Sequence, residues 1–262
     1  MQTILIMGCG NMGGAMLAGW LRGGMNPAQF TVVDPVLAAA PAGVELLRVV
    51  PQGRAYAFVL LAIKPQLLPS LAPAISAAIT AETTVLSVLA GAELASLAAL
   101  FPQAKGTVRV MPNLAAAIGK SPVALSGHGQ LDTAAITALF APLGTVAWLD
   151  EQQFDVLTAL VGSGPAFVYR FIDALAAGAV ALDLPKDAAQ ALALAMVEGA
   201  AALAGQAGVA PDELARRVAS PGGTTEAGLR VLDQDAALAR LVAETLAAAS
   251  QRSAEMAEIA RK

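Results

Sequence analysis

The sequence predicts an α/β protein, with a doubly wound, mostly parallel sheet in residues 1–150 and an all-helical domain in residues 151–262. Two observations predict it. Short apolar runs alternate with helical patterns up to Asp150, as in successive βαβ units. After Asp150 we find no convincing strand, only long alanine-rich helical patterns. A length of 262 residues is enough for two ordinary domains.

Seven strands are expected in the first domain. They are Ile4–Met7, Phe30–Val33, Tyr56–Ile63, Thr84–Val88, Thr107–Met111, Val123–Ser126 and Thr145–Trp148. The run Tyr56–Ile63 is apolar throughout, as expected of a strand covered on both faces. The helices between them are Asn11–Arg22, Leu67–Ile79, Ala92–Leu100 and Asp132–Phe140.

Six helices are expected in the second domain. They are Gln153–Leu160, Pro165–Leu182, Lys186–Ala204, Asp212–Val218, Gly222–Leu232 and Ala236–Ile259. Breaks are expected at the Gly- and Pro-containing stretches 162–165, 183–185, 208–211 and 220–221. The broad apolar faces of these helices predict burial within the chain or against a second copy.

Composition narrows the function classes. The net charge is −4 and no basic stretch occurs, which argues against nucleic acid as a partner. A single cysteine excludes an intrachain disulfide framework and fits a reducing cytosol. Residues 161–182 form the longest membrane-like segment, but Arg170 and Asp173 interrupt it. A buried helix of a soluble protein is therefore expected there, and a cytoplasmic location overall.

The motif Gly8-Cys9-Gly10-Asn11-Met12-Gly13 follows the first strand and opens the first helix. In that setting it predicts a dinucleotide site. Gly8 permits the tight turn, Gly10 lets the backbone meet the pyrophosphate, and Gly13 lets helix and strand pack closely. The alternative is a glycine-rich turn without a nucleotide. We expect Cys9 to fill space rather than to act in redox chemistry.

Asp34 ends the second strand, at the spacing where an acid accepts hydrogen bonds from the ribose hydroxyls. It would repel a 2′-phosphate, and the nearest downstream arginines are Arg48 and Arg54. The position of this acid alone predicts NADH as the preferred coenzyme. It also predicts that Asp34→Ser shifts the coenzyme preference toward NADPH. The alternative is a turn aspartate before Pro35.

Further candidates lie at expected strand ends. Lys64, Arg109 and Asn113 occupy loops at the carboxyl edge of the sheet, which faces the ligand crevice in such folds. Solvated side chains are the alternative. His128 is expected in a surface turn, and no cluster of His, Cys or carboxylates has metal-ligand spacing.

A second glycine signal, Ser220-Pro221-Gly222-Gly223-Thr224-Thr225, lies near the C-terminus. Ser220 can cap a helix and Pro221 fits its first turn. The amides of the glycines, with the helix dipole, could then hold a carboxylate or phosphate. A glycine-rich helix start without a ligand is the alternative.

Together these motifs resemble the pyrroline-5-carboxylate reductases over nearly the whole chain. The matching segments are Gly8–Gly13, Ala62-Ile63-Lys64-Pro65, Arg109–Asn113, Gly162–Phe167 and Ser220–Thr225. The last of these segments is the most specific. Leu114-Ala115 depart from the Thr-Pro that often follows Asn113 in the family, and Asp34 stands where many members carry Ser, Thr or a basic residue.

The resemblance implies a Rossmann domain, an intertwined helical dimerisation domain and, in some members, rings of dimers. It implies reduction of 1-pyrroline-5-carboxylate to L-proline, the last step of proline synthesis, usually with NADPH and sometimes with NADH. It implies that the loops at Gly8–Gly13 and Ala62–Pro65 hold the cofactor. The Gly222–Thr225 segment would hold the substrate carboxylate, and Thr225 would hydrogen-bond or protonate the ring nitrogen.

Two other functions stay open at the level of sequence. A β-hydroxyacid dehydrogenase has a similar glycine loop, but it uses a lysine in the first long helix of its second domain. No lysine occurs here between Lys120 and Lys186. A non-catalytic dinucleotide sensor would not need the second anion site.

Overall fold

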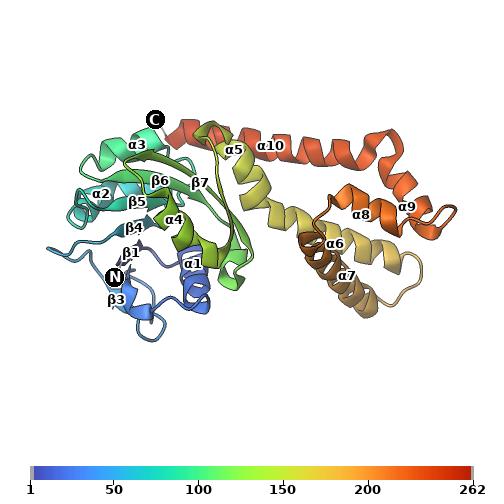
Figure 1. The fold of residues 1–262 in the computed structure, drawn as a ribbon, viewed down its shortest axis with the longest axis horizontal. Coiled ribbons are helices and arrows are strands. Elements are labelled where there is room, and N and C mark those ends of the chain that lie inside the picture. Colours follow the sequence, from blue (N-terminus) through green and yellow to red (C-terminus); the bar gives the residue numbers. More distant parts are fainter. Residues whose placement is uncertain (1–2, 261–262) are drawn as a thin grey trace. The chain divides into compact units, whose positions relative to one another are not determined.

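An eight-stranded sheet forms the N-terminal part of the computed structural model, which describes residues 3–260 (Figure 1). Its strand order is β3-β2-β1-β4-β5-β6-β7-β8. The strands are β1 Ile4–Met7, β2 Phe30–Val33, β3 Glu45–Leu47, β4 Phe58–Leu61, β5 Thr84–Ser87, β6 Gly106–Met111, β7 Ser121–Gly129 and β8 Gly144–Trp148. All neighbours are parallel except β6 and β7. The predicted mostly parallel, doubly wound sheet is confirmed.

Helices and short helical turns connect the strands. The α-helices are α1 Asn11–Arg22, α2 Leu68–Ser76, α3 Leu94–Leu100 and α4 Thr133–Phe140. The 3₁₀ turns are η1 Pro27–Gln29, η2 Pro65–Leu67, η3 Leu114–Ile118 and η4 Ala141–Leu143.

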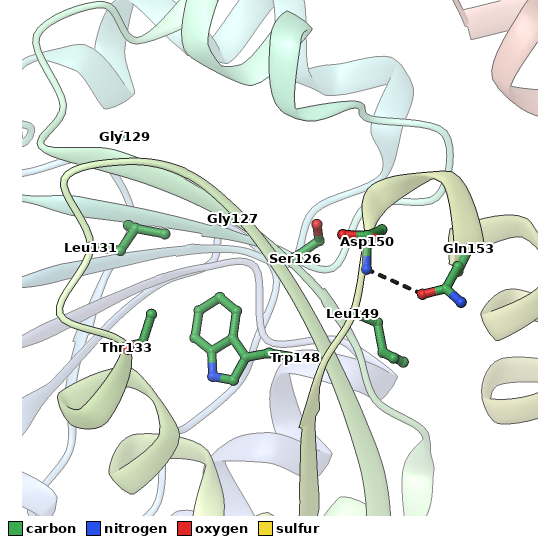
Figure 2. A pocket seen from close by; sticks show the side chains of 9 residues that line it. All are labelled: Ser126, Gly127, Gly129, Leu131, Thr133, Trp148, Leu149, Asp150 and Gln153. Carbon is green, nitrogen blue, oxygen red and sulfur yellow. Dashed lines mark hydrogen bonds between the residues drawn. The ribbon is translucent and has the colours of Figure 1, made fainter.

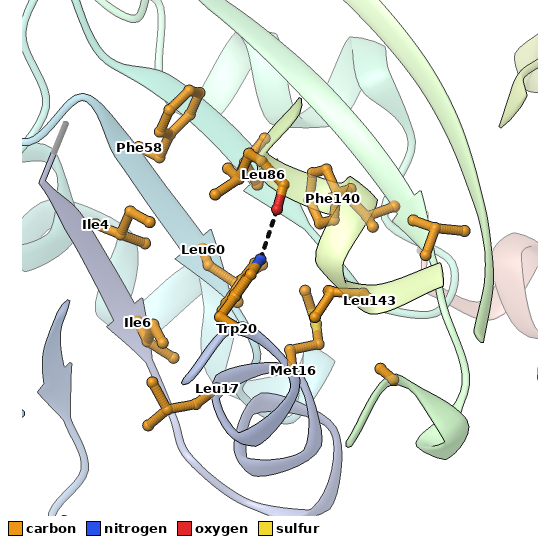
Figure 3. Close-up of a cluster of buried hydrophobic side chains, with 14 of the residues drawn as sticks. Ile4, Ile6, Met16, Leu17, Trp20, Phe58, Leu60, Leu86, Phe140 and Leu143 are labelled. Carbon is orange, nitrogen blue, oxygen red and sulfur yellow. Dashed lines mark hydrogen bonds between the residues drawn. The ribbon is translucent and has the colours of Figure 1, made fainter. Parts of the chain in front are cut away.

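Two hydrophobic clusters cover the two faces of the sheet. Alternate residues of β1 divide between them: Ile4 and Ile6 enter one cluster, Leu5 and Met7 the other. This double burial explains why β1 is apolar at every position. In the first cluster Trp20 is fully buried, and its indole N–H donates to the Leu139 carbonyl at 2.7 Å (Figure 3). The core therefore fixes α1, whose N-terminus carries the glycine loop.

The chain beyond β8 is helical as far as it is described. Its elements are η5 Glu151–Gln153, α5 Phe154–Leu157, the π-helical segment η6 Thr158–Ser163, α6 Gly164–Val180, α7 Lys186–Gln206, α8 Pro211–Val218, α9 Thr224–Asp233, η7 Gln234–Ala236 and α10 Ala237–Ala260. Ser163–Ala248 form one compact unit. The end of α10, from Ala249, belongs with the chain up to Gly162, and there Ser253 donates to Asp155 at 2.7 Å. The proposed boundary between residues 150 and 151 stays a prediction.

The break expected at residues 162–165 is wrong, because the helix continues there through the π-helical segment. Pro165 has no N–H to donate to the Val161 carbonyl four residues earlier. The Asn113 side-chain amide donates to that carbonyl instead, at 3.1 Å. Asn113, which lies between β6 and η3, thus supplies the hydrogen bond that the proline removes.

Other differences are smaller. Strand β3 was not expected; it has three residues and pairs with β2. His128 is exposed as expected, but it lies within β7 opposite Thr107 rather than in a turn. Within residues 3–260 one helix, α7, has the length and apolarity to cross a bilayer, and 11% of that stretch is buried within the single chain.

Candidate functional site

The first glycine loop is shaped by close packing between β1, α1 and the end of β4. Gly8 has a φ of +87°, and a Cβ there would lie 2.7 Å from the Ala62 carbonyl oxygen. A Cβ on Gly13 would lie 2.4 Å from the Gly8 carbonyl oxygen and 3.2 Å from the Ala62 Cβ. Only glycine fits at either position. The structure thus brings the loop against Ala62, the first residue of the Ala62–Pro65 segment.

Gly10 differs from its two neighbours in the motif. A Cβ on Gly10 would meet no atom within 4 Å among the described residues beyond its own chain neighbours. Gly10 is also the N-cap of α1, and no side chain of the described chain caps that helix. The first amides of α1 are therefore available to an anion, and the space beside Gly10 lets a diphosphate approach them. This geometry fits a dinucleotide.

Cys9 lies inside this loop as a half-buried thiol. Burial first, and then the charge of Asp34, raises the pKa of the thiol above its ordinary value. A protonated thiol is a poor nucleophile. The prediction that Cys9 fills space in the loop therefore agrees with its electrostatics.

Asp34 is buried at the end of β2, and its carboxylate is held by backbone amides. One oxygen accepts from the Cys9 N–H at 2.9 Å, and the other accepts from the Val36 and Leu37 N–H groups, each at 2.9 Å. Burial alone would raise the pKa of this carboxyl, but the three amides and the nearby Arg48 outweigh it and lower the pKa. Asp34 thus ties the glycine loop to the turn after β2.

The Ala62–Pro65 segment leads from β4 into η2. Ala62 and Ile63 contact the glycine loop, since a Cβ on Gly8 would also lie 3.1 Å from the Ile63 Cγ2. Lys64 is exposed and precedes η2, in which Pro65 is the first residue. Its ammonium makes no hydrogen bond or ion pair with any residue the structure describes. Lys64 is therefore an exposed positive charge between β4 and η2.

Arg109 and Asn113 are both buried, so the alternative that their side chains are solvated is wrong. Arg109 is 8% exposed, pairs with Glu151 at 2.9 Å and lies 4.4 Å over the Phe154 ring. Glu151 also accepts from the Leu94 N–H at 2.7 Å. Arg109 thus links the sheet edge to the start of the helical segment.

The second glycine loop starts α9 differently from the prediction. The helix begins at Thr224 with Gly223 as its N-cap, so the expected cap at Ser220 and first turn at Pro221 are wrong. Ser220 instead accepts the Gly223 N–H through its carbonyl at 2.9 Å, in a turn where Gly222 has a φ of +73°. The left-handed conformation of Gly222 explains the shift, because it separates Pro221 from the helix.

Thr224 and Thr225 form the first turn of α9, and both are exposed. The Thr225 hydroxyl makes no hydrogen bond within the described chain. Glu226, the third residue of the helix, accepts the Gly222 N–H at 2.6 Å. A carboxylate thus already binds one of the amides expected to hold an anion.

A separate pocket of about 510 Å³ lies over β7, β8 and the start of η5 (Figure 2). Trp148, Leu131 and Ser126 line it, and the Asp150 N–H donates to the Gln153 side chain at 3.2 Å. None of the predicted site residues lines this pocket. A cavity alone is weaker evidence than the uncapped helix start at Gly10, so we keep the glycine loops as the candidate site.

The sequence reasoning missed two residues near these loops. Arg48 was noted only as a downstream arginine, because the short strand β3 that positions it was not recognised. Glu226 was not considered. The feature that could have identified Glu226 is its place three positions after a helix N-cap. An acidic side chain there usually accepts from a free backbone amide before the helix.

Comparison with known proteins gives two family matches. A model described as pyrroline-5-carboxylate reductase dimerisation matches residues 151–256. A model described as NADP oxidoreductase coenzyme F420-dependent matches residues 3–91. The first match covers nearly all of the helical segment, and the second contains the first glycine loop, Asp34 and the Ala62–Pro65 segment.

Individual relatives cover nearly the full length. The pyrroline-5-carboxylate reductase of Pseudomonas aeruginosa is 35% identical, over 97% of each chain. A pyrroline-5-carboxylate reductase structure from Coxiella burnetii is 28% identical with a TM-score of 0.90, covering 97% of this chain and 98% of that one. The Plasmodium falciparum pyrroline carboxylate reductase with NADP bound shares the fold, with a TM-score of 0.82, 22% identity and 98% coverage of both chains.

Proposed function

Because the chain belongs to the pyrroline-5-carboxylate reductase family, we propose that it reduces 1-pyrroline-5-carboxylate to L-proline with NADPH or NADH, the last step of proline biosynthesis. One observation carries the proposal beyond family membership. A single chain combines a glycine-lined helix start that suits a diphosphate with a second, exposed helix start that suits a small carboxylate.

The cofactor half of the site is assigned to the first loop. The amides at the start of α1 would hold the diphosphate, with Gly8, Cys9, Gly10, Asn11, Met12 and Gly13 forming the loop. Asp34 would fix the far end of that loop through the Cys9 N–H. Ala62, Ile63, Lys64 and Pro65 would form its neighbouring wall. A bound NAD(P)H supplies the hydride for the imine carbon.

The substrate half is assigned to the second loop. Ser220 and Gly223 shape the turn through the hydrogen bond from the Gly223 N–H to the Ser220 carbonyl, and the amides of Gly222, Thr224 and Thr225 would hold the substrate carboxylate. The hydrogen bond from the Gly222 N–H to Glu226 supports this for one of the amides, since its acceptor is a carboxylate oxygen that the substrate carboxylate would replace. The exposed Thr225 hydroxyl would donate to the ring nitrogen as the imine gains its hydride.

The enzyme would act as a homodimer in the cytoplasm. Large apolar side chains on α7 support dimerisation: Leu192, Leu194 and Met196 are each more than half exposed in the single chain. A row of such side chains needs a covering surface, and symmetric dimers are the commonest assemblies. Sedimentation should give a dimer or a multiple of it. Leu194→Asp should give monomer or aggregate, whereas Gln206→Asp at the end of the same helix should not.

The reaction is tested directly with the purified protein. NADPH or NADH should be oxidised only when 1-pyrroline-5-carboxylate is added, and chromatography should detect an equal amount of proline. A hydroxy acid with the oxidised coenzymes serves as the comparison for the dehydrogenase alternative. No proline above background with either coenzyme would refute the proposal.

A further inference from the structure

We propose that Arg48 binds the 2′-phosphate of NADPH. Arg48, and not Asp34, then sets the preference between NADPH and NADH. The inference rests on the proposed function, because it requires a dinucleotide at the first glycine loop. It reverses the expectation from sequence that Asp34 excludes the phosphate. Three features of the turn after β2 carry it.

The first feature is that Asp34 is already occupied. A carboxylate has about four lone-pair positions, and three backbone N–H groups take three of them. The oxygen that accepts from Val36 and Leu37 is saturated, and the side chain as a whole is 7% exposed. Asp34 therefore cannot accept from both ribose hydroxyls without giving up the turn or the glycine loop.

The second feature is the position of Arg48. It directly follows β3, whose last residue Leu47 is paired in register with Val33, the residue before Asp34. Its Nη1 donates to the carbonyl oxygens of Asp34 at 2.8 Å and Leu37 at 2.7 Å. These two bonds place the guanidinium on the turn that follows β2, where the adenosine ribose lies in this type of fold.

The third feature is that the rest of the guanidinium is free. Arg48 is exposed, and its Nη2 and Nε make no hydrogen bond or ion pair with the residues that the structure describes. These donors form the edge that suits a phosphate. The neighbouring Arg54 is not equivalent, because Glu45 holds it at 2.8 Å.

The charges on the turn favour a phosphate more than the sequence suggests. The charge of the Asp34 carboxylate is compensated mainly by the three backbone amides and to a smaller extent by the charge of Arg48. A 2′-phosphate would meet the exposed cation before the buried anion. This compensation lowers the repulsion between Asp34 and a 2′-phosphate, from which a preference for NADH was expected.

Equilibrium binding of the two coenzymes, without the imine, tests the assignment. NADPH and NADH are titrated by calorimetry into wild type, Arg48→Gln, Arg48→Lys and the control Arg54→Gln. Arg48→Gln should weaken the binding of NADPH by roughly tenfold or more, as expected for the loss of one charge-assisted phosphate contact. It should weaken the binding of NADH by less than about twofold. Arg48→Lys keeps the charge and should recover most of the loss, and Arg54→Gln should match wild type. The affinity for the fragment 2′,5′-ADP should change among the variants as the affinity for NADPH does, and the affinity for 5′-ADP as that for NADH does.

Three results would overturn the assignment: equal weakening of both coenzymes, which means that Arg48 only supports the turn; no weakening of either; or a wild type that binds NADH much more tightly than NADPH. A failure of the proposed function looks different. Coenzyme binding would then keep its dependence on Arg48, but no proline would form from the imine.

Discussion

The two glycine loops have similar compositions but are held in place in different ways. A Cβ on Gly8 would strike the Ala62 carbonyl oxygen and a Cβ on Gly13 the Gly8 carbonyl oxygen, and Asp34 holds the Cys9 amide from the end of another strand. Among the described residues, the loop at Gly222 is hydrogen-bonded by its own neighbours: Ser220 accepts from Gly223, and Glu226 accepts from Gly222. Tertiary packing therefore preorganises the first loop, whereas the bonds that shape the second, within the described part of the chain, are local. Substitutions at Gly8 or Gly13 should accordingly affect folding, and substitutions in the second loop should affect turnover.

Thr225→Ala should have the largest effect on turnover. If the hydroxyl donates to the substrate nitrogen, its loss should lower kcat by roughly 10²–10⁴-fold, the usual range for a positioned proton donor. Coenzyme affinity and melting temperature should stay near wild type, because Thr225 is exposed and forms no side-chain hydrogen bond in the described chain. Steady-state kinetics, calorimetry and thermal melting measure the three quantities.

Thr225→Ser is the matched variant, since it keeps the hydroxyl, and it should retain much of the activity. If Thr225 only packs or caps α9, Thr225→Ala would melt earlier and its folded fraction would turn over normally. A folded Thr225→Ala protein with an unreduced kcat would remove this residue from the site.

Gly13→Ala and Gly10→Ala separate folding from binding within the first loop. The Gly13 Cβ would lie 2.4 Å from a backbone oxygen, so the variant must shift α1 against β1. We expect a loss of roughly 1–3 kcal/mol in the free energy of unfolding, as in other overpacked cores. Gly10→Ala meets no described atom there, so it should fold like wild type but bind NADPH and NADH less tightly, by about tenfold.

Urea unfolding and coenzyme titration of both variants make this comparison. Normal coenzyme binding by a stable Gly10→Ala protein would mean that no ligand approaches that face of the loop. A Gly13→Ala protein as stable as wild type would mean that the close packing of α1 on β1 does not contribute to the free energy of unfolding.

Most of the sheet could be predicted because its strands are short apolar runs between clear helical patterns. Strand β1, helix α1 and strand β2 have the predicted bounds. Strand β3 could not be predicted, since its three residues are only partly buried and gain strand structure by pairing with β2. The continuous helix at Pro165 was also missed. The donor that makes it possible belongs to Asn113, 48 positions from its acceptor Val161 in the sequence.

The sequence indicates which residue types the candidate site contains, but not how they are arranged. The glycine patterns and the residue after β2 were visible, because spacing alone identifies them. Whether the Asp34 carboxylate faces a ligand or the backbone depends on where the Val36 and Leu37 amides point, and sequence does not carry that information. The same limit applies to Ser220, which turns the chain through its carbonyl rather than capping with its hydroxyl.

Asp34→Asn should reveal the structural role of the carboxylate through pH. The folded protein lowers the pKa of Asp34, so its charge stabilises the native state above the ordinary aspartate pKa of about 3.9. That contribution is lost as the pH falls through the folded-state pKa. At pH 7 the variant should be less stable by about 1–3 kcal/mol, since an amide N–H facing Cys9 cannot accept its hydrogen bond. The difference should shrink below about pH 4. Urea unfolding at several pH values measures it, and a constant difference across that range would contradict this explanation.

Glu226→Gln should have the smallest effect, and it tests whether the second loop is occupied by its own helix. The Glu226 carboxylate accepts the Gly222 N–H at 2.6 Å, so the substrate carboxylate must displace it or bind beside its charge. Removing the charge should lower KM for the imine by roughly two- to fivefold, since a charge at a helix N-terminus is worth about 0.3–1 kcal/mol. The kcat should stay unchanged, because Glu226 has no part in proton transfer. The exposed Asp233→Asn, at the other end of α9, makes the same change in charge and should leave KM unaltered. A higher KM in Glu226→Gln would mean the reverse: that Glu226 holds the loop in the shape the substrate needs, and that local order limits binding there more than competition does.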